Sequence, residues 1–247
     1  MDLAGTPSDE VDAILATGRG DITTVFVSMS ARHPDGADGE YLEWHSLDHR
    51  PEQHRLAALR SSLRLVSTPA CRAARAVSHP HLDAVDHLMT YFFAETSGFK
   101  GFAELSAALH DAGRMPYALP PVERGAYEVR ETRAAPRCRI GADVLPWFPA
   151  SGVYVLVEQG DAHVGELVDV PGVAGAWSAV AVPSDPSVAA AEVGQRITYC
   201  FLDVDPVAIA GELAPVLERR WREGRVTPLL AAPFHTLVPG EWTRYLP

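Results

Sequence analysis

The segment EYLEWHSLDHRPEQ, residues 40–53, decides how the rest of the sequence is interpreted. No other stretch gathers so many side chains that can transfer protons, bind a metal or hold an anion. We predict a helix that begins at Glu40. Because a proline disfavours helical geometry at the residue before it, we also predict a break at Pro51. One helical piece would end near His49, and a second would run over residues 51–62.

Runs of apolar and β-branched residues predict the other elements of the chain. In the first half we predict strands at residues 22–30, 64–76, 85–95 and 125–132, and a second helix over 98–112. Residues 134–149 contain three prolines and little periodicity, which is typical of a linker. In the second half we predict strands at 153–159, 170–182, 196–204 and 226–238, a short helix over 161–168 and a long helix over 206–222. The order β-α-β-β-α-β therefore occurs twice.

This repeated order predicts an α+β protein made of two tandem ferredoxin-like units, residues 1–135 and 136–247. Each unit would form a four-stranded antiparallel sheet with helices on one face. A single unit leaves its other sheet face bare, so we predict that the two units pack sheet to sheet. The arrangement resembles the dimeric α+β barrel superfamily, in a tandem single-chain, pseudo-dimeric form.

Two motifs carry the resemblance. The helix with Tyr41, Trp44 and His45 resembles the first helix of the EthD-like group, which carries an aromatic residue and a histidine. The turn DVPGVAGAW, residues 169–177, resembles the entry to the second strand of such units. By element order the resemblance covers about nine-tenths of the chain. It implies a cofactor-independent lyase, cyclase or oxygenase that binds an aromatic or polyketide-like substrate between helix and sheet.

Helical spacing would bring the proposed catalytic side chains onto one stripe. The catalytic residues would be Tyr41, His45, Asp48 and His49, and Glu52 lies on the same stripe. His45 or His49 would act as acid or base near neutral pH, and Asp48 would orient the imidazole. Tyr41 or Arg50 would stabilise a developing oxyanion. The competing interpretation is a solvated helix face with a local ion pair between Asp48 and Arg50.

Four residues are predicted to contact the substrate. Arg50 and Trp44 belong to the same helical segment, while Tyr91 and His87 lie on the strand predicted over residues 85–95. Histidines also concentrate in the first half of the chain. They include His33, His45, His49, His54, His79, His81 and His87. The first unit would therefore carry the site, and the second would mainly close the barrel.

Two other functional classes compete with this hypothesis. His45 and His49 have the spacing that lets two imidazoles bind one divalent metal ion, with Glu52 as a third ligand. The glutamate of an HExxH motif is missing, because Ser46 follows His45. Alternatively, His45 or His49 would be the axial ligand of a haem. A non-catalytic small-molecule-binding protein is the third hypothesis. The main hypothesis itself requires neither a metal nor another cofactor.

Composition restricts the partners. There are 21 basic and 32 acidic residues, for a net charge of −11, which argues against binding to nucleic acid or to an anionic membrane surface. The three cysteines form no CxxC pair, and no apolar run is long enough to span a bilayer. The N-terminus lacks a signal-peptide pattern, so we predict a cytoplasmic protein with a small-molecule substrate. Whether it also forms a homodimer is left open.

Overall fold

Strand β1 (Thr24–Ser30) lies in the middle of the first half of the structure. The computed structural model describes residues 21–183, 191–224 and 226–247. β1 pairs antiparallel with β4 (His87–Phe93) on one side and with β5 (Pro121–Ala134) on the other. β4 in turn pairs with β2 (Leu59–Val66). Numbered along this half, the strands therefore lie in the order second, third, first, fourth.

The second half repeats this order with four other strands. They are β6 (Gly152–Gly160), β7 (Val173–Ala181), β8 (Gln195–Leu202) and β9 (Val226–Thr236). β8 lies between β7 and β6, and β9 pairs with the other side of β6. All of these pairings are antiparallel.

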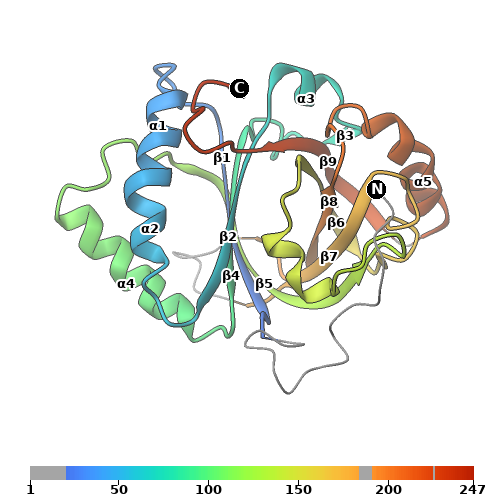
Figure 1. The fold of residues 1–247 in the computed structure, drawn as a ribbon, viewed down its shortest axis with the longest axis horizontal. Helices are drawn as coiled ribbons and strands as arrows, with labels where there is room; N and C mark the ends of the chain where they lie inside the picture. Colours follow the sequence, from blue (N-terminus) through green and yellow to red (C-terminus); the bar gives the residue numbers. More distant parts are fainter. Residues whose placement is uncertain (1–20, 184–190, 225) are drawn as a thin grey trace.

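The two sheets join at both edges. β5 pairs with β7, and β9 pairs with β2 through Leu65 opposite Thr236 and Val66 opposite His235. The eight strands therefore close into one antiparallel barrel, seen in the centre of Figure 1. The predicted α+β barrel is confirmed. The edge-to-edge pairing comes in addition to the predicted contact between sheet faces, and the short strand β3 (Val77–Ser78) extends the sheet beside β9.

The inside of the barrel is a packed apolar core. Alternate residues of β1, namely Val25, Val27 and Met29, point into it, because successive side chains of a strand face opposite sides of a sheet. Large side chains from both halves fill the space, among them Phe92, Tyr127, Tyr199, Phe201 and Phe234. A ligand must therefore bind outside the barrel, against the outer face of a sheet.

Helices cover the outer faces of the barrel (Figure 1). Over the first sheet lie α1 (Asp38–Trp44), the π-helix η2 (His45–His49), α2 (Arg50–Gln53) and α4 (Gly98–Asp111). Over the second sheet lies α5 (Ala210–Glu223). The short helices α3 (Pro69–Ala73) and η3 (Ala142–Trp147) connect strands. Within the described parts of the chain, no helix has both the length and the apolar character needed to cross a membrane.

The second half differs from the prediction in its first crossover. The helix predicted over residues 161–168 is absent, and the segment forms turns. Its apolar residues Val164, Leu167, Val168 and Val170 are buried against the second sheet and α5. These side chains fill the position that the α1 segment occupies in the first half. The buried side chains of this crossover therefore occupy space that in the first half lies between helix and sheet.

The strand predicted over residues 64–76 is also wrong in part. β2 ends at Val66, and α3 begins at Pro69. The Thr68 side chain accepts a hydrogen bond from the backbone N–H of Cys71, which caps the helix. A proline in the first turn of a helix loses no hydrogen bond, so the threonine–proline pair begins a helix instead of interrupting a strand.

Candidate active site

The helical segment over the first sheet is continuous through Pro51, so the predicted break is wrong. Arg50 has helical dihedral angles, φ −62° and ψ −43°, and its N–H donates to the carbonyl of His45, five residues earlier. The wider π-turn accommodates a proline because it relieves the clash between the ring and the carbonyl of the preceding turn. The second piece ends at Gln53 instead of Ser62, since residues from Leu59 onward form β2.

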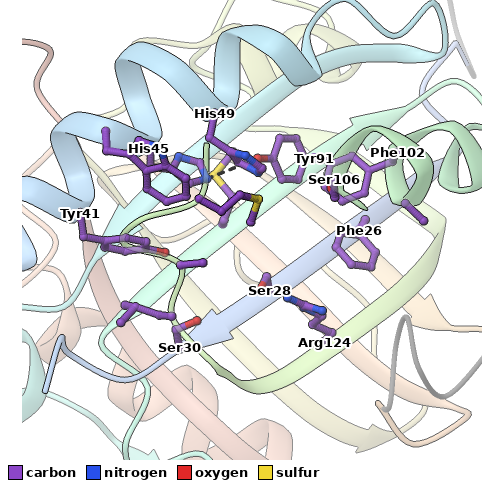
Figure 2. Close-up of a pocket in the computed structure, with 16 residues that line it drawn as sticks. Phe26, Ser28, Ser30, Tyr41, His45, His49, Tyr91, Phe102, Ser106 and Arg124 are labelled. Atoms are coloured by element: carbon purple, nitrogen blue, oxygen red, sulfur yellow. Dashed lines mark hydrogen bonds between the residues drawn. The ribbon is translucent and has the colours of Figure 1, made fainter. Parts of the chain in front are cut away.

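A cavity of about 370 Å³ lies between this helical segment, α4 and the outer face of the first sheet. Figure 2 shows Tyr41, His45 and His49 on the helix side and Ser28, Ser30 and Arg124 on the sheet side. The other lining residues are Phe26, Trp44, Met89, Tyr91, Phe102, Ala103, Ser106, Met115, Ala118 and Leu119. The volume lies within the range typical of small-molecule sites. The predicted cleft between first helix and first sheet therefore exists.

Aromatic rings form much of the cavity wall. Phe102 of α4 lies 5.2 Å from the ring of Phe26 and 4.8 Å from that of Tyr91. On the helix side, the Trp44 ring lies 5.4 Å from the imidazole of His49. Such surfaces favour a flat aromatic or conjugated ligand, because ring faces and edges give it large contact areas.

His45 is buried and faces Tyr91 across the cavity wall. Its Nε2 lies 3.4 Å from the Tyr91 hydroxyl, and its Nδ1 is buried without a hydrogen-bond partner within the described part of the chain. Burial lowers the pKa of His45 well below its ordinary value, and the nearby charge of Arg64 lowers it further. Burial also raises the pKa of Tyr91. At neutral pH the pair is therefore a neutral imidazole beside a protonated phenol.

His49 is a second neutral imidazole in the same wall. Its ring centroid lies 5.2 Å from that of His45, and its Nε2 lies 3.4 Å from Nε2 of Gln53. The Gln53 amide also donates to the Ser106 hydroxyl at 3.2 Å, which ties α2 to α4. Burial lowers the pKa of His49 to about 4, and Arg64 contributes in the same direction. Both histidines are therefore in the neutral, unprotonated form near pH 7.

Arg64 of β2 lies close to the cavity and was missed by sequence reasoning, as was Arg124 of β5 in the cavity lining. Only 3% of Arg64 is exposed, and its Nε and Nη2 have no hydrogen-bond partner within the described residues. Its guanidinium lies 4.5 Å from the centroid of the Tyr41 ring. A buried cation without a carboxylate partner is costly, and it creates a positive potential behind the two histidines. Arg64 lies in a segment with several other polar residues, so nothing in the sequence distinguished it as a site residue.

Three predicted site residues lie outside the cavity lining. The Asp48 carboxylate pairs with Arg114 on the surface, so it orients neither histidine. His87 is fully buried and bonds Asp38 at 2.8 Å; its ring lies 5.0 Å from Tyr41, behind the cavity wall. Arg50 is half-buried beside the segment. The expected pairing of Asp48 with Arg50 is likewise replaced by the contact with Arg114.

The alternative metal site of His45, His49 and Glu52 does not form in this structure. Glu52 binds Arg55 at 2.8 Å and Arg114 at 3.3 Å on the surface, away from the two histidines. In the ranges that the structure describes, no group of three or more His, Cys, Asp or Glu side chains could hold a metal ion. The third ligand is missing because the helix is continuous, so Glu52 lies on the same helix face as Asp48.

Axial ligation of a haem also fits the geometry poorly. His45 presents Nε2 to the Tyr91 hydroxyl, and His49 presents Nε2 to Gln53. The Nδ1 atoms of both residues are buried inside the protein wall. An axial histidine needs a ring nitrogen directed at an open face. To bind iron, the Nε2 atoms of His45 and His49 would have to leave the Tyr91 hydroxyl and the Gln53 amide.

Comparison with known proteins adds information on the fold. No family model and no curated protein matches the sequence. Among solved structures, a chlorite dismutase from Candidatus Nitrospira defluvii is similar over 95% of this chain and 98% of its own, with 10% identity and a TM-score of 0.52. A dye-decolorizing peroxidase from Bacteroides thetaiotaomicron is similar over 89% of this chain and 94% of its own, with 12% identity and a TM-score of 0.50. The chain thus shares the α+β barrel fold of these two proteins, and its eight barrel strands come from a single polypeptide.

Proposed function

We propose that this protein is a small-molecule enzyme that performs acid–base chemistry on an aromatic or polyketide-like substrate, as a lyase, cyclase or cofactor-independent oxygenase. The observation that carries the proposal is the position of His45. It is a buried, neutral imidazole in the wall of an aromatic cavity, on the sheet face that the barrel leaves open for a ligand. A neutral imidazole has the free lone pair that a general base needs.

In the proposed reaction, His45 removes a proton from an acidic C–H or O–H of the bound substrate, and an enolate or phenolate remains. The Tyr91 hydroxyl is within reach of the same imidazole and donates to the new oxyanion. Arg64 lies behind Tyr41 and stabilises negative charge in the cavity through its unpaired guanidinium. The proton on His45 then returns to the product.

We also infer that the two halves are two ferredoxin-like units with the boundary near residue 135. The equal strand order in the two halves supports this division. The first unit carries the cavity and the second closes the barrel, with its own crossover position filled by apolar side chains. We use the EthD-like group as a functional analogy, because Tyr41, Trp44 and His45 resemble the residues of its first helix. We further propose a cytoplasmic location and the formation of a homodimer.

Proton abstraction can be measured without knowledge of the natural substrate. Aryl 1,3-diketones exchange their acidic C–H for deuterium in D₂O, and NMR follows the exchange. We expect the protein to accelerate exchange of a diketone that fits the cavity, and we expect the His45→Ala variant to lose the acceleration. His110→Ala is the matched control, because His110 lies exposed on α4.

A binding protein without catalytic activity is the second candidate, and the aromatic wall by itself would serve it equally well. The same measurement separates the two functions. If the diketones quench the fluorescence of Trp44 but exchange no faster than in buffer, the cavity binds without catalysis and the enzyme proposal is wrong. Acceleration that survives in the His45→Ala variant would refute the assignment of the base.

A further inference from the structure

A row of four side chains crosses the outer face of the first sheet, and three of them, Met89, Ser28 and Arg124, line the cavity. Strand register places Arg64 of β2 opposite Met89 of β4, Met89 opposite Ser28 of β1, and Ser28 opposite Arg124 of β5. Directly opposed side chains on one face lie about 5 Å apart at Cβ. The row therefore has an arginine at each end, with a thioether and a hydroxyl between them.

Arg124 is the one formally charged side chain among the described residues that line the cavity. Neither aspartate nor glutamate is part of that lining. Arg124 is half-buried, and its guanidinium forms no hydrogen bond or ion pair within the described ranges. Figure 2 shows it beside Ser28, on the wall opposite His45 and His49. An arginine that is held in a partly apolar cavity without a counter-charge is suited to an anionic ligand.

We propose that the ligand is an aromatic or conjugated carboxylate whose carboxylate group binds Arg124 and the Ser28 hydroxyl. The inference rests on the proposed function, because it concerns the same cavity. The planar guanidinium offers two parallel N–H donors, which match the two oxygens of a carboxylate. Phe26, Tyr91 and Phe102 would contact the flat part of the molecule.

This placement also orients the ligand. With its carboxylate on the sheet side at Arg124, the rest of the molecule extends toward the helix side, where His45 lies. The carboxylate would therefore anchor the ligand and would not be the reacting group. Arg64, at the other end of the row and next to Tyr41, is left to stabilise charge that develops near the histidines.

The test compares matched ligands. Naphthalene-1-carboxylate, its primary amide and 1-naphthyl phosphate share one ring system and differ in the polar group. Binding is followed by calorimetry at pH 7 and by the tryptophan fluorescence of the protein, to which Trp44 in the cavity lining contributes. We expect the carboxylate to bind at least about ten-fold more tightly than the amide, because the carboxylate, unlike the amide, can form two charge-assisted bonds to the guanidinium.

Three variants locate the effect. Arg124→Gln should reduce the ratio between carboxylate and amide to about one, while Arg124→Lys should retain part of it, since charge remains but the fork is lost. Arg130→Gln is the matched control on the same strand, because Arg130 is exposed and pairs with Glu128. Ala103→Trp should abolish binding of all ligands by filling the cavity. Circular dichroism and thermal unfolding verify that each variant is folded.

Each contrary result has a defined meaning. If carboxylate and amide bind equally, and Ala103→Trp blocks both, the carboxylate inference is wrong while the cavity and the proposed function stand. Tighter binding of the phosphate than of the carboxylate would also overturn the inference. Binding that Ala103→Trp leaves unchanged, or no binding by any carboxylate at millimolar concentration, would contradict the inference, and the deuterium-exchange experiment then judges the proposed function separately.

Discussion

The Tyr91 hydroxyl lies 3.4 Å from Nε2 of His45, with both side chains buried in the wall of one cavity. The two residues come from different layers, since Tyr91 belongs to the central sheet and His45 to the helix that covers it. Within the proposed mechanism this pair connects the base to a phenolic hydrogen-bond donor.

The first prediction concerns this pair. Tyr91→Phe keeps the ring and removes the hydroxyl, so we expect kcat/KM to fall by about ten- to a hundred-fold. The free energy of unfolding should change by no more than about 1 kcal/mol, because the lost hydrogen bond is long. Steady-state kinetics and urea unfolding measure the two effects. Loss of stability in step with loss of activity would instead indicate a structural role for Tyr91.

The second prediction concerns stability against pH. The pKa of His49 is lowered to about 4 in the folded state, whereas an unfolded histidine has a pKa near 6.5. Between these values the unfolded chain binds more protons, so stability falls as pH decreases below about 6.5. From pH 7 to pH 5 we expect His49 alone to cost about 2 kcal/mol of the free energy of unfolding.

Urea unfolding of the wild type and of the His49→Gln variant at pH 7 and pH 5 measures this term. We expect the wild type to lose more stability than the variant between the two pH values, by about the same 2 kcal/mol. The exposed residue His110 provides the control His110→Gln, which should behave like the wild type. An equal pH dependence in the wild type and the His49 variant would show that His49 is not held neutral by the fold.

The third prediction concerns Asp48, which sequence reasoning placed in the catalytic group. Its carboxylate pairs with Arg114 on the surface and contacts neither histidine. We therefore expect Asp48→Asn to leave kcat/KM within about two-fold of the wild type and to cost less than about 1 kcal/mol, as is usual for exposed ion pairs. A large loss of activity in this variant would mean that the helix rearranges when substrate binds.

The fourth prediction concerns the division of the chain. A fragment that ends at Pro136 would expose the inner sheet face, with Val25, Val27 and Phe92, and would leave β2 and β5 as open edges. We expect this fragment to aggregate, because bare apolar faces and unpaired edge strands promote association.

Coexpression tests the same prediction in the opposite direction. When residues 137–247 are produced in the same cells, the two pieces should assemble into a soluble complex, since β5 regains β7 and β2 regains β9. Size-exclusion chromatography and circular dichroism report the result. A soluble, monomeric and folded first fragment would contradict the proposed dependence of the first half on the second.

Some of this protein was determined by local sequence. Runs of apolar and β-branched residues specified strands β1 and β4, and helical periodicity specified α4, so the doubled element order and the barrel could be predicted. Tyr41 and His45 lie one turn apart, which placed them on one face of the helix before any tertiary contact was known. These features depend on neighbours within a few residues, and the sequence contains those neighbours directly.

Only the tertiary structure decided the rest. The π-turn at His45–His49 makes the helix continue through Pro51, where local rules predict a break. Arg114, which lies 66 residues away in the sequence, forms the ion pair with the Asp48 carboxylate. The row from Arg64 to Arg124 exists because strand register aligns four strands, and register depends on long-range pairing. Charge balance in the cavity follows from such distant contacts, and periodicity along the chain carries no information about them.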